Sequence, residues 1–183
     1  MTRSLAITLN ALALYAIALV LLIAFGAQLT LHELPCPLCL LQRIQFAMLA
    51  VGPILNVRFG PRPSHYAVAL LTAAAGAAFA SRQVLLHIMP GDAGYGSALL
   101  GYHYYSWAFI GFAVAIIALA AMLLFDGQFR DDGKPQPIGA FACAAVWLVI
   151  ALTALNVFST LLECGFGACA DNPLGYELLK RAS

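Results

Sequence analysis

Five stretches of this 183-residue chain are long and apolar enough to cross a lipid bilayer as helices. A membrane-spanning helix needs about 20 mainly apolar residues. Leucine and alanine dominate the five stretches, whereas the strands of a membrane barrel show short segments of alternating hydrophobicity. The sequence therefore predicts an all-α integral membrane protein with five transmembrane helices. The expected spans are Leu5–Leu31, Leu38–Val57, Tyr66–Ile88, Tyr105–Phe125 and Ile138–Leu162.

The composition agrees with a membrane protein and excludes other classes. Hydrophobic residues make up 63% of the chain and charged residues only 9%, whereas soluble proteins have about 45–50% and about 25%. A chain rich in aliphatic residues and poor in charge is not intrinsically disordered. The formal net charge of +1 excludes a nucleic-acid-binding protein that relies on positive charge.

The loop charges predict an orientation, because short cytoplasmic loops carry an excess of lysine and arginine. The loops near Cys36 and Tyr95 contain neither residue type, and the C-terminal tail has only Lys180 and Arg181. We therefore expect a cytoplasmic N-terminus, with these two loops and the tail on the outer side. The basic residues of the expected cytoplasmic side are Arg3, Arg58, Arg62, Arg130 and Lys134.

Four of the five cysteines form two closely spaced pairs on the expected outer side. Cys36 and Cys39 make a C-x-x-C motif at the start of the second span, and Cys164 and Cys169 follow the fifth span. Paired cysteines facing an oxidising compartment indicate disulfides, either structural or redox-active. Cys143 lies inside the fifth span and is expected to be an inert packing residue.

The first pair has the surroundings of a reactive thiol. A helix N-terminus stabilises the thiolate, which is the reactive form of cysteine, and Pro37 suits the first turn of a helix. Arg43 follows Cys39 by four residues, so it lies on the same helix face. A guanidinium at this depth needs an anion, a cavity or lipid headgroups. Two interpretations remain: a redox site with Arg43 beside a thiolate or cofactor, or a structural disulfide with Arg43 reaching the headgroups.

The second pair is less specific. Gly165 and Gly167 make the loop between Cys164 and Cys169 pliable, so the pair could close a disulfide that a partner reaches. A static disulfide that fixes the tail is the alternative. A structural zinc site needs four ligands, and the nearby tail has no histidine, so we expect no metal.

Two segments resemble the disulfide bond formation protein B (DsbB) family. One is Pro-Cys-Pro-Leu-Cys-Leu-Leu-Gln-Arg at residues 35–43, and the other is Ser-Arg-Gln-Val-Leu-Leu-His-Ile-Met-Pro at residues 81–90. The resemblance covers roughly residues 1–125 and implies a four-helix transmembrane bundle. It also implies a bacterial inner-membrane thiol oxidase, so that the outer side expected from the loop charges, where the C-terminus lies, would be the periplasm. Such an enzyme passes electrons from a DsbA-like periplasmic protein to ubiquinone or menaquinone.

The same resemblance assigns expected roles to individual residues. Cys36 and Cys39 would be the redox pair next to the quinone, and Arg43 would help to hold the quinone and stabilise charge transfer. Arg82, Gln83 and His87 end the third span at the outer face. Their position level with Arg43, and not the resemblance, makes them candidates for binding the quinone carbonyls, with interfacial anchoring as the alternative.

The chain departs from the family pattern in the loop between the third and fourth spans. The family's second cysteine pair lies in that loop, but residues 91–103 contain no cysteine. We therefore expect Cys164 and Cys169 to replace that pair as a relay, and the partner is either DsbA-like or a dedicated dithiol substrate. The predicted organisation is one membrane domain, with a DsbB-like part (1–125), a cytoplasmic loop and fifth helix (126–162) and a periplasmic tail (163–183).

Three other functions remain open on the sequence. A vitamin K epoxide reductase-like quinone reductase also pairs a helix-end C-x-x-C with outer cysteines, although its catalytic pair comes late in the chain. A structural subunit would hold static disulfides. A copper-handling membrane protein would use soft ligands, here Cys36, Cys39, His32, His87 and His103.

Overall fold

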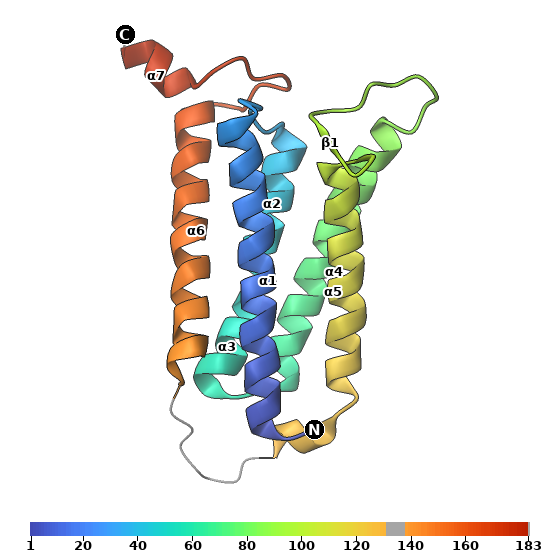
Figure 1. The fold of residues 1–183 in the computed structure, drawn as a ribbon, viewed down its shortest axis with the longest axis vertical. Coiled ribbons are helices and arrows are strands. Elements are labelled where there is room, and N and C mark those ends of the chain that lie inside the picture. The colour runs from blue at the N-terminus through green and yellow to red at the C-terminus, as the bar shows by residue number, and fades with distance from the viewer. Residues whose placement is uncertain (131–137, 183) are drawn as a thin grey trace.

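The computed structural model describes residues 1–130 and 138–182, which form an upright helical bundle (Figure 1). Its shorter elements are β1 (Ala98–Leu99), β2 (Tyr102–His103), the 3₁₀ helix η1 (Asp126–Phe129) and α7 (Glu177–Ala182). Each of the five expected spans is confirmed, with ends within three residues of the expected positions. The long helices are α1 (Arg3–Thr30), α2 (Pro37–Leu49), α3 (Val51–Phe59), α4 (Pro63–Leu86), α5 (Tyr104–Leu123) and α6 (Ala140–Cys164).

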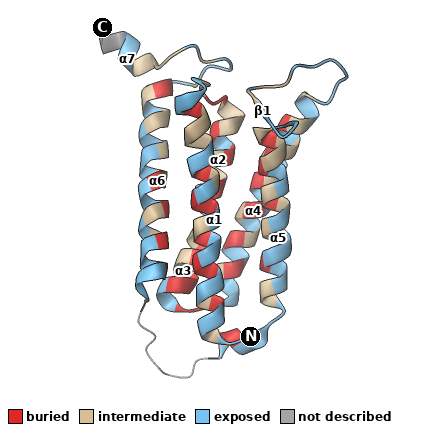
Figure 2. Cartoon of the chain, viewed as in Figure 1, coloured by how far each residue is buried: buried red, intermediate tan, exposed pale blue. Residues whose placement is uncertain are grey.

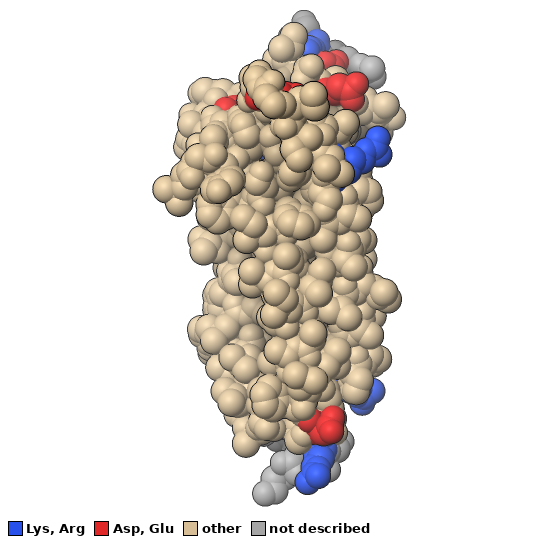
Figure 3. Space-filling model, turned by 90° about the vertical axis from the view of Figure 1, so that its right-hand side faces the viewer, with Lys and Arg blue, Asp and Glu red and all other residues tan. Residues whose placement is uncertain are grey.

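The outer surface of the bundle is apolar along its length. Large side chains such as Leu71 and Ile117 are 72% and 70% exposed, and the pale exposed positions follow the outer faces of the helices (Figure 2). On the face in Figure 3, charged residues gather toward the two ends and leave a belt without charge between them. A surface of this kind matches the hydrocarbon core of a bilayer, so the chain is a multi-pass membrane protein.

The second span is divided into α2 and α3 at Ala50. Pro53 is the third residue of α3. A proline lacks the N–H that would bond to the carbonyl four residues earlier, here Leu49, and its ring clashes with that carbonyl. The proline therefore explains why a helix ends before it and a new one begins, while both parts together still cross the membrane.

Small residues and stacked aromatic rings hold the helices together. The Phe46 ring of α2 stacks on the Phe112 ring of α5, with centroids 4.1 Å apart. Gly76 of α4 lies against Phe112 so closely that an added Cβ would overlap the ring. Close approach at small residues is typical of helices packed in membranes. The fifth long helix, α6, packs along α1 and also meets α2.

A buried polar cluster joins four elements at the end that carries the N-terminus. Asn10 donates to the Tyr66 hydroxyl (2.8 Å), Asn56 donates to Asn10 (2.9 Å), and Tyr66 donates to Gln128 (2.8 Å). These bonds connect α1, α3, α4 and η1, and they satisfy polar groups that would be costly in an apolar core. The hydrogen bonds therefore hold these four elements together at this end of the bundle.

The basic residues expected on one side do gather at this end. Arg3 begins α1, Arg58 lies in the last turn of α3, and Arg62 and Arg130 lie in the neighbouring connections. Lys134 lies outside the described residues. Which side of a membrane this end faces stays a prediction, as does the division into residues 1–125, 126–162 and 163–183.

Candidate redox site

Both cysteine pairs lie at the end of the bundle opposite the N-terminus (Figure 1). Cys36 and Cys39 form a disulfide at the beginning of α2. The Cys36 side chain caps the helix, because its sulfur accepts a hydrogen bond from the Cys39 amide at 3.1 Å. Pro37 is the first helical residue, as the sequence predicts. The free N–H groups of this first turn favour negative charge on either sulfur once the disulfide is reduced.

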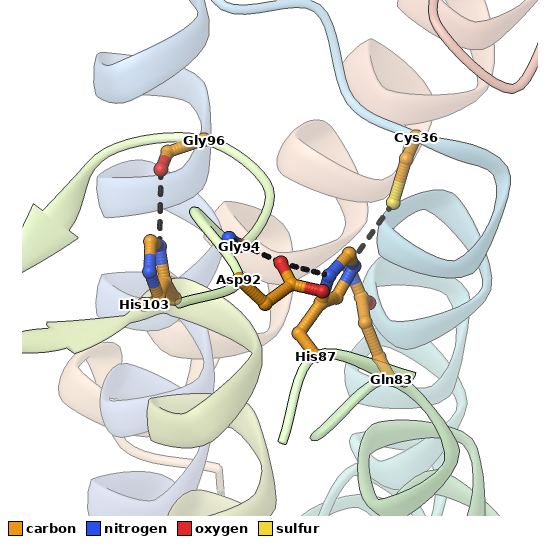
Figure 4. Close-up of polar contacts among 7 residues, drawn as sticks. All are labelled: Cys36, Gln83, His87, Asp92, Gly94, Gly96 and His103. Atoms are coloured by element: carbon orange, nitrogen blue, oxygen red, sulfur yellow. Dashed lines mark hydrogen bonds and ion pairs between the residues drawn. The ribbon is translucent and has the colours of Figure 1, made fainter. Parts of the chain in front are cut away.

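Gln83 of α4 contacts both sulfurs from the neighbouring helix. Its side chain is 1% exposed, and its amide nitrogen lies 3.3 Å from Cys36 Sγ and 3.4 Å from Cys39 Sγ. Figure 4 shows the contact with Cys36. The Gln83 carbonyl accepts a hydrogen bond from Gln42 Nε2 at 2.7 Å. This bond orients the amide so that its N–H groups point toward the sulfurs, where they would stabilise a thiolate.

Arg43 lies one turn after Cys39 and is half-buried between α1 and α2. Its guanidinium donates to the Gln28 side chain (2.6 Å) and to the Ala24 carbonyl (2.9 Å), both on α1. It also lies 5.7 Å from the centre of the Phe25 ring, within the range of a cation–π interaction. Three contacts on one helix therefore fix the cation at this depth.

An apolar cavity of about 500 Å³ contains both Cys39 and Arg43 in its wall. Its sides come from α1 and α5, and Phe46 of α2 and Leu100 of the loop before α5 also line it. Pockets for small molecules typically have about 300–1,000 Å³ and a few polar groups among apolar walls. The cavity thus has the size and chemistry for a small, largely apolar ligand next to a sulfur and a cation.

The loop between α4 and α5 contributes to the wall of this cavity. Tyr95, Gly96 and Leu99 of the loop line it. The Tyr95 hydroxyl donates to the Leu34 carbonyl at 2.8 Å, and Glu33 accepts hydrogen bonds from the amide and hydroxyl of Ser97. These contacts tie the loop to the segment just before Cys36.

Two further contacts shape the loop (Figure 4). Asp92 accepts a hydrogen bond from the Gly94 amide at 2.7 Å and lies 3.1 Å from His87 Nδ1. The hydrogen bond from Gly94 lowers the pKa of Asp92 most, and the contact with His87 lowers it further. The strands β1 and β2 meet at a tight turn in which Leu100 and Gly101 have φ values of 53° and 83°. That pair of positive φ values is typical of a two-residue hairpin turn.

The structure places the four expected cofactor-binding residues in four different surroundings. Arg43 lines the cavity, and Gln83 contacts the sulfurs. Arg82 is exposed on α4, and His87 stacks on the Tyr105 ring at 5.6 Å and pairs with Asp92. Neither Arg82 nor His87 lines the cavity.

The tail pair is also closed. Cys164 is the last residue of α6, and Gly165 with a φ of 65° turns the chain so that Cys169 returns to form a disulfide. Gln28 of α1 donates to Ser159 of α6 (2.9 Å) and to the Tyr176 hydroxyl of the tail (3.1 Å). Because Gln28 also accepts from Arg43, one amide connects the cavity cation, α6 and the tail.

Sequence reasoning missed several polar residues of this region. Gln28 and Gln42 are 3% and 5% exposed, and each bonds across helices. The only available signal was a polar residue inside or beside an apolar span, which is often functional or joins helices. Cys143, expected to pack inside the bundle, is instead exposed on α6, on the side that faces lipid in a membrane.

Among residues 1–130 and 138–182, no group of three or more histidine, cysteine or acidic side chains is placed to hold a metal ion. Two of the histidines considered as copper ligands, His87 and His103, each stack on the Tyr105 ring.

Replacing Gln83 with leucine is expected to destabilise the fold and the reduced cysteine pair together. The change removes the N–H groups from the sulfurs and leaves buried Gln42 without its partner, which costs about 1–3 kcal/mol in the free energy of unfolding. It also removes a hydrogen bond that would stabilise the thiolate once the disulfide is reduced. Denaturant unfolding and the pH dependence of thiol alkylation measure the two effects. The exposed neighbour provides a control, since Arg82→Gln is expected to change stability by less than about 0.5 kcal/mol; equal effects of the two variants would contradict the role of Gln83.

The chain is similar to proteins of one family over its first half. The sequence model described as "Disulfide bond formation protein DsbB" matches residues 6–97. The Disulfide bond formation protein B of Xanthomonas axonopodis pv. citri (strain 306) is 39% identical over 74 residues, which are 38% of this chain and 43% of that protein. The protein of the same name from Azoarcus sp. (strain BH72) is 37% identical over 75 residues, 38% of this chain and 45% of that protein. The matched segment therefore spans less than half of these relatives, and no solved structure matches the chain.

Proposed function

The chain belongs to the disulfide bond formation protein B family, and from that premise we propose that it is a membrane thiol–disulfide oxidoreductase. It reoxidises a dithiol protein outside the cytoplasm and passes the two electrons to a membrane quinone, ubiquinone or menaquinone. The observation that carries the proposal is the Cys36–Cys39 disulfide at a helix start, with Cys39 sharing the wall of an apolar cavity with Arg43. Copper handling has no comparable support.

The residues of the cavity fit a quinone. A quinone ring is flat and apolar with carbonyl oxygens at its edge, and the cavity combines apolar walls with the guanidinium of Arg43 and the phenol of Tyr95. A bound quinone supplies the acceptor for two electrons and two protons. Arg43 and the walls contributed by α1 and α5 would hold it beside Cys39.

The chain's own cysteines define the order of events. One thiol of the dithiol partner attacks the Cys164–Cys169 disulfide and forms a mixed disulfide. The second thiol of the partner then breaks this mixed disulfide and leaves the tail cysteines reduced. The resulting tail dithiol then reduces Cys36–Cys39 by a second exchange. A donor with a DsbA-like potential near −120 mV requires an acceptor of comparable or higher potential, and a respiratory quinone meets this requirement. The helix start, Gln83 and Arg43 favour the thiolate that exchange requires.

The proposed location is the bacterial inner membrane. Arg3, Arg58, Arg62 and Arg130 at one end of the bundle support a cytoplasmic N-terminus by the excess of positive charge on that side. The opposite end, with both disulfides, then faces the periplasm, where disulfides persist. The partner is a DsbA-like thioredoxin-fold protein or a dedicated dithiol substrate.

The test uses the full chain in lipid vesicles with ubiquinone and a reduced thioredoxin-fold dithiol protein. Loss of the quinone absorbance is expected only when protein and dithiol are both present. Menaquinone is compared in the same assay. A wild-type protein that reduces neither quinone, although both of its disulfides can be reduced, would overturn the proposal.

Replacing both tail cysteines with serine is expected to separate the two kinds of electron donor. The Cys164→Ser and Cys169→Ser double variant should lose at least about 100-fold in rate with the protein dithiol, because the entry disulfide is gone. With dithiothreitol, which is small enough to reach Cys36–Cys39 directly, the rate should persist. Cys143→Ser, a change at the exposed cysteine of the same helix, is the matched control and should leave both rates unchanged. Unchanged turnover with the protein donor would show that the tail disulfide is structural and carries no electrons.

A further inference from the structure

Glu163 is a buried carboxylate that the proposed cycle has not yet used. It precedes Cys164 at the end of α6 and is 3% exposed. Neither of its oxygens has a hydrogen-bond partner among residues 1–130 and 138–182. Buried polar groups are almost always paired, and ionisable residues within membrane spans usually mark proton or ion pathways. The unpartnered carboxylate therefore indicates a function.

The groups that face Glu163 belong to the cavity. The guanidinium of Arg43 on α2 is within electrostatic reach of the carboxylate, but its hydrogen bonds go to Gln28 and Ala24 on α1. Tyr95 of the loop is the second group. Burial raises the pKa of Tyr95 most, and the negative charges of Glu163 and Glu33 raise it further. Arg43 and Tyr95 both line the cavity, so Glu163 interacts electrostatically with two polar groups of the cavity wall.

The half-buried cation Arg43 can thus interact with two anions, one at a time. While Cys36–Cys39 is a disulfide, the only negative charge facing Arg43 from α6 is that of Glu163. Reduction of the disulfide places a thiolate at Cys39, one helical turn from Arg43. Two anions beside one cation repel each other at low dielectric, so one of them binds a proton. The Cys39 thiolate is stabilised by the start of α2 and by the N–H of Gln83, whereas the Glu163 carboxylate has no hydrogen-bond donor among the described residues, so the proton binds to the carboxylate.

We propose that Glu163 binds a proton when the Cys39 thiolate forms and releases it when that thiolate is oxidised. The inference rests on the proposed quinone reductase function and adds the proton carrier to it. Glu163 acts through Arg43 and is a positioning and proton-holding residue.

The steps balance in atoms and charge. In the exchange, the Cys36–Cys39 bond breaks and the Cys164–Cys169 bond forms as two electrons move between the pairs. Of the two thiol protons of the tail, one goes to Cys36 and the other to Glu163, while Cys39 stays a thiolate. When the Cys36–Cys39 bond forms again, two electrons pass to the quinone. The two protons that accompany them come from Cys36 and Glu163, which returns to the carboxylate.

Infrared difference spectroscopy of the full chain without quinone tests the proton on Glu163. Reduction of the cysteine pairs is expected to produce the carbonyl band of a protonated carboxyl group. Glu163→Gln and Cys39→Ser should both lack this change, the first because the carboxyl is gone and the second because no thiolate forms. Glu33→Gln is the matched control, since Glu33 is satisfied by Ser97, and it should keep the band. A band that persists in Glu163→Gln, or no band in the wild type, would overturn the inference.

Quinone reduction provides the second readout and separates the two proposals. Glu163→Gln should reduce quinone about 100-fold more slowly than wild type, within the range of a lost acid–base group, while exchange between the cysteine pairs, followed by alkylation, stays complete. Glu163→Asp, which keeps the carboxyl, should recover part of the rate. If the wild type reduces no quinone but shows the band, the proposed acceptor is wrong and the proton site stands. If quinone reduction is normal in Glu163→Gln, the proton site is wrong and the function stands.

Discussion

Replacing Cys39 with serine is expected to abolish quinone reduction with a protein dithiol and with dithiothreitol alike. Cys39 lines the cavity and accepts the N–H of Gln83, so a serine there removes the sulfur from which electrons leave. In the tail variants, dithiothreitol can still reduce Cys36–Cys39 directly. In Cys39→Ser it cannot, because the Cys36–Cys39 bond no longer forms. The loss should reach the background rate of the assay without protein.

The remaining sulfurs show whether this loss is specific. The Cys39→Ser protein should still form the Cys164–Cys169 disulfide and exchange it with the protein dithiol, which gel shifts after alkylation measure. Cys36→Ser should behave in the same way in the quinone assay. Residual turnover of Cys39→Ser above background would mean that electrons reach the quinone from the tail pair and would contradict the proposed order of the two pairs.

Replacing Arg43 with leucine is expected to lower the rate of quinone reduction by about 10- to 100-fold. A hydrogen bond to a charged group contributes about 1.5–3 kcal/mol, and each 1.36 kcal/mol corresponds to a factor of ten in rate. The variant loses the positive charge beside Cys39 and leaves Gln28 without its donor. Steady-state rates at several quinone concentrations separate weaker quinone binding from slower electron transfer.

Two further variants distinguish the charge from the fold. Arg43→Lys keeps the charge but lacks the planar fork that bonds Gln28 and the Ala24 carbonyl together, so an intermediate rate is expected. Arg58→Leu removes an exposed arginine at the opposite end of the bundle and should leave the rate unchanged. If Arg43→Leu unfolds at the wild-type denaturant concentration and still reduces quinone normally, Arg43 has no part in the reaction.

Sequence spacing predicted the position of some site residues correctly and of others not. The spacing of Cys39 and Arg43 on one helical turn made them neighbours, and the structure places both in one cavity wall. Gln83 and His87 both belong to the end of the expected third span. The helix, however, ends at Leu86, so His87 turns toward Asp92 and Tyr105 while Gln83 stays against the sulfurs.

The sequence by itself determined the five spans, the start of α2 at Pro37 and the pairing of near cysteines, because hydropathy, capping and short spacing are properties of adjacent residues. Only the tertiary structure decided that Gln83 of α4 contacts sulfurs on α2, that Gln28 connects Arg43 with the tail, and that Glu163 is buried facing Arg43. These contacts depend on which faces of separate helices meet. In a chain whose spans are apolar on nearly every side, periodicity does not mark those faces.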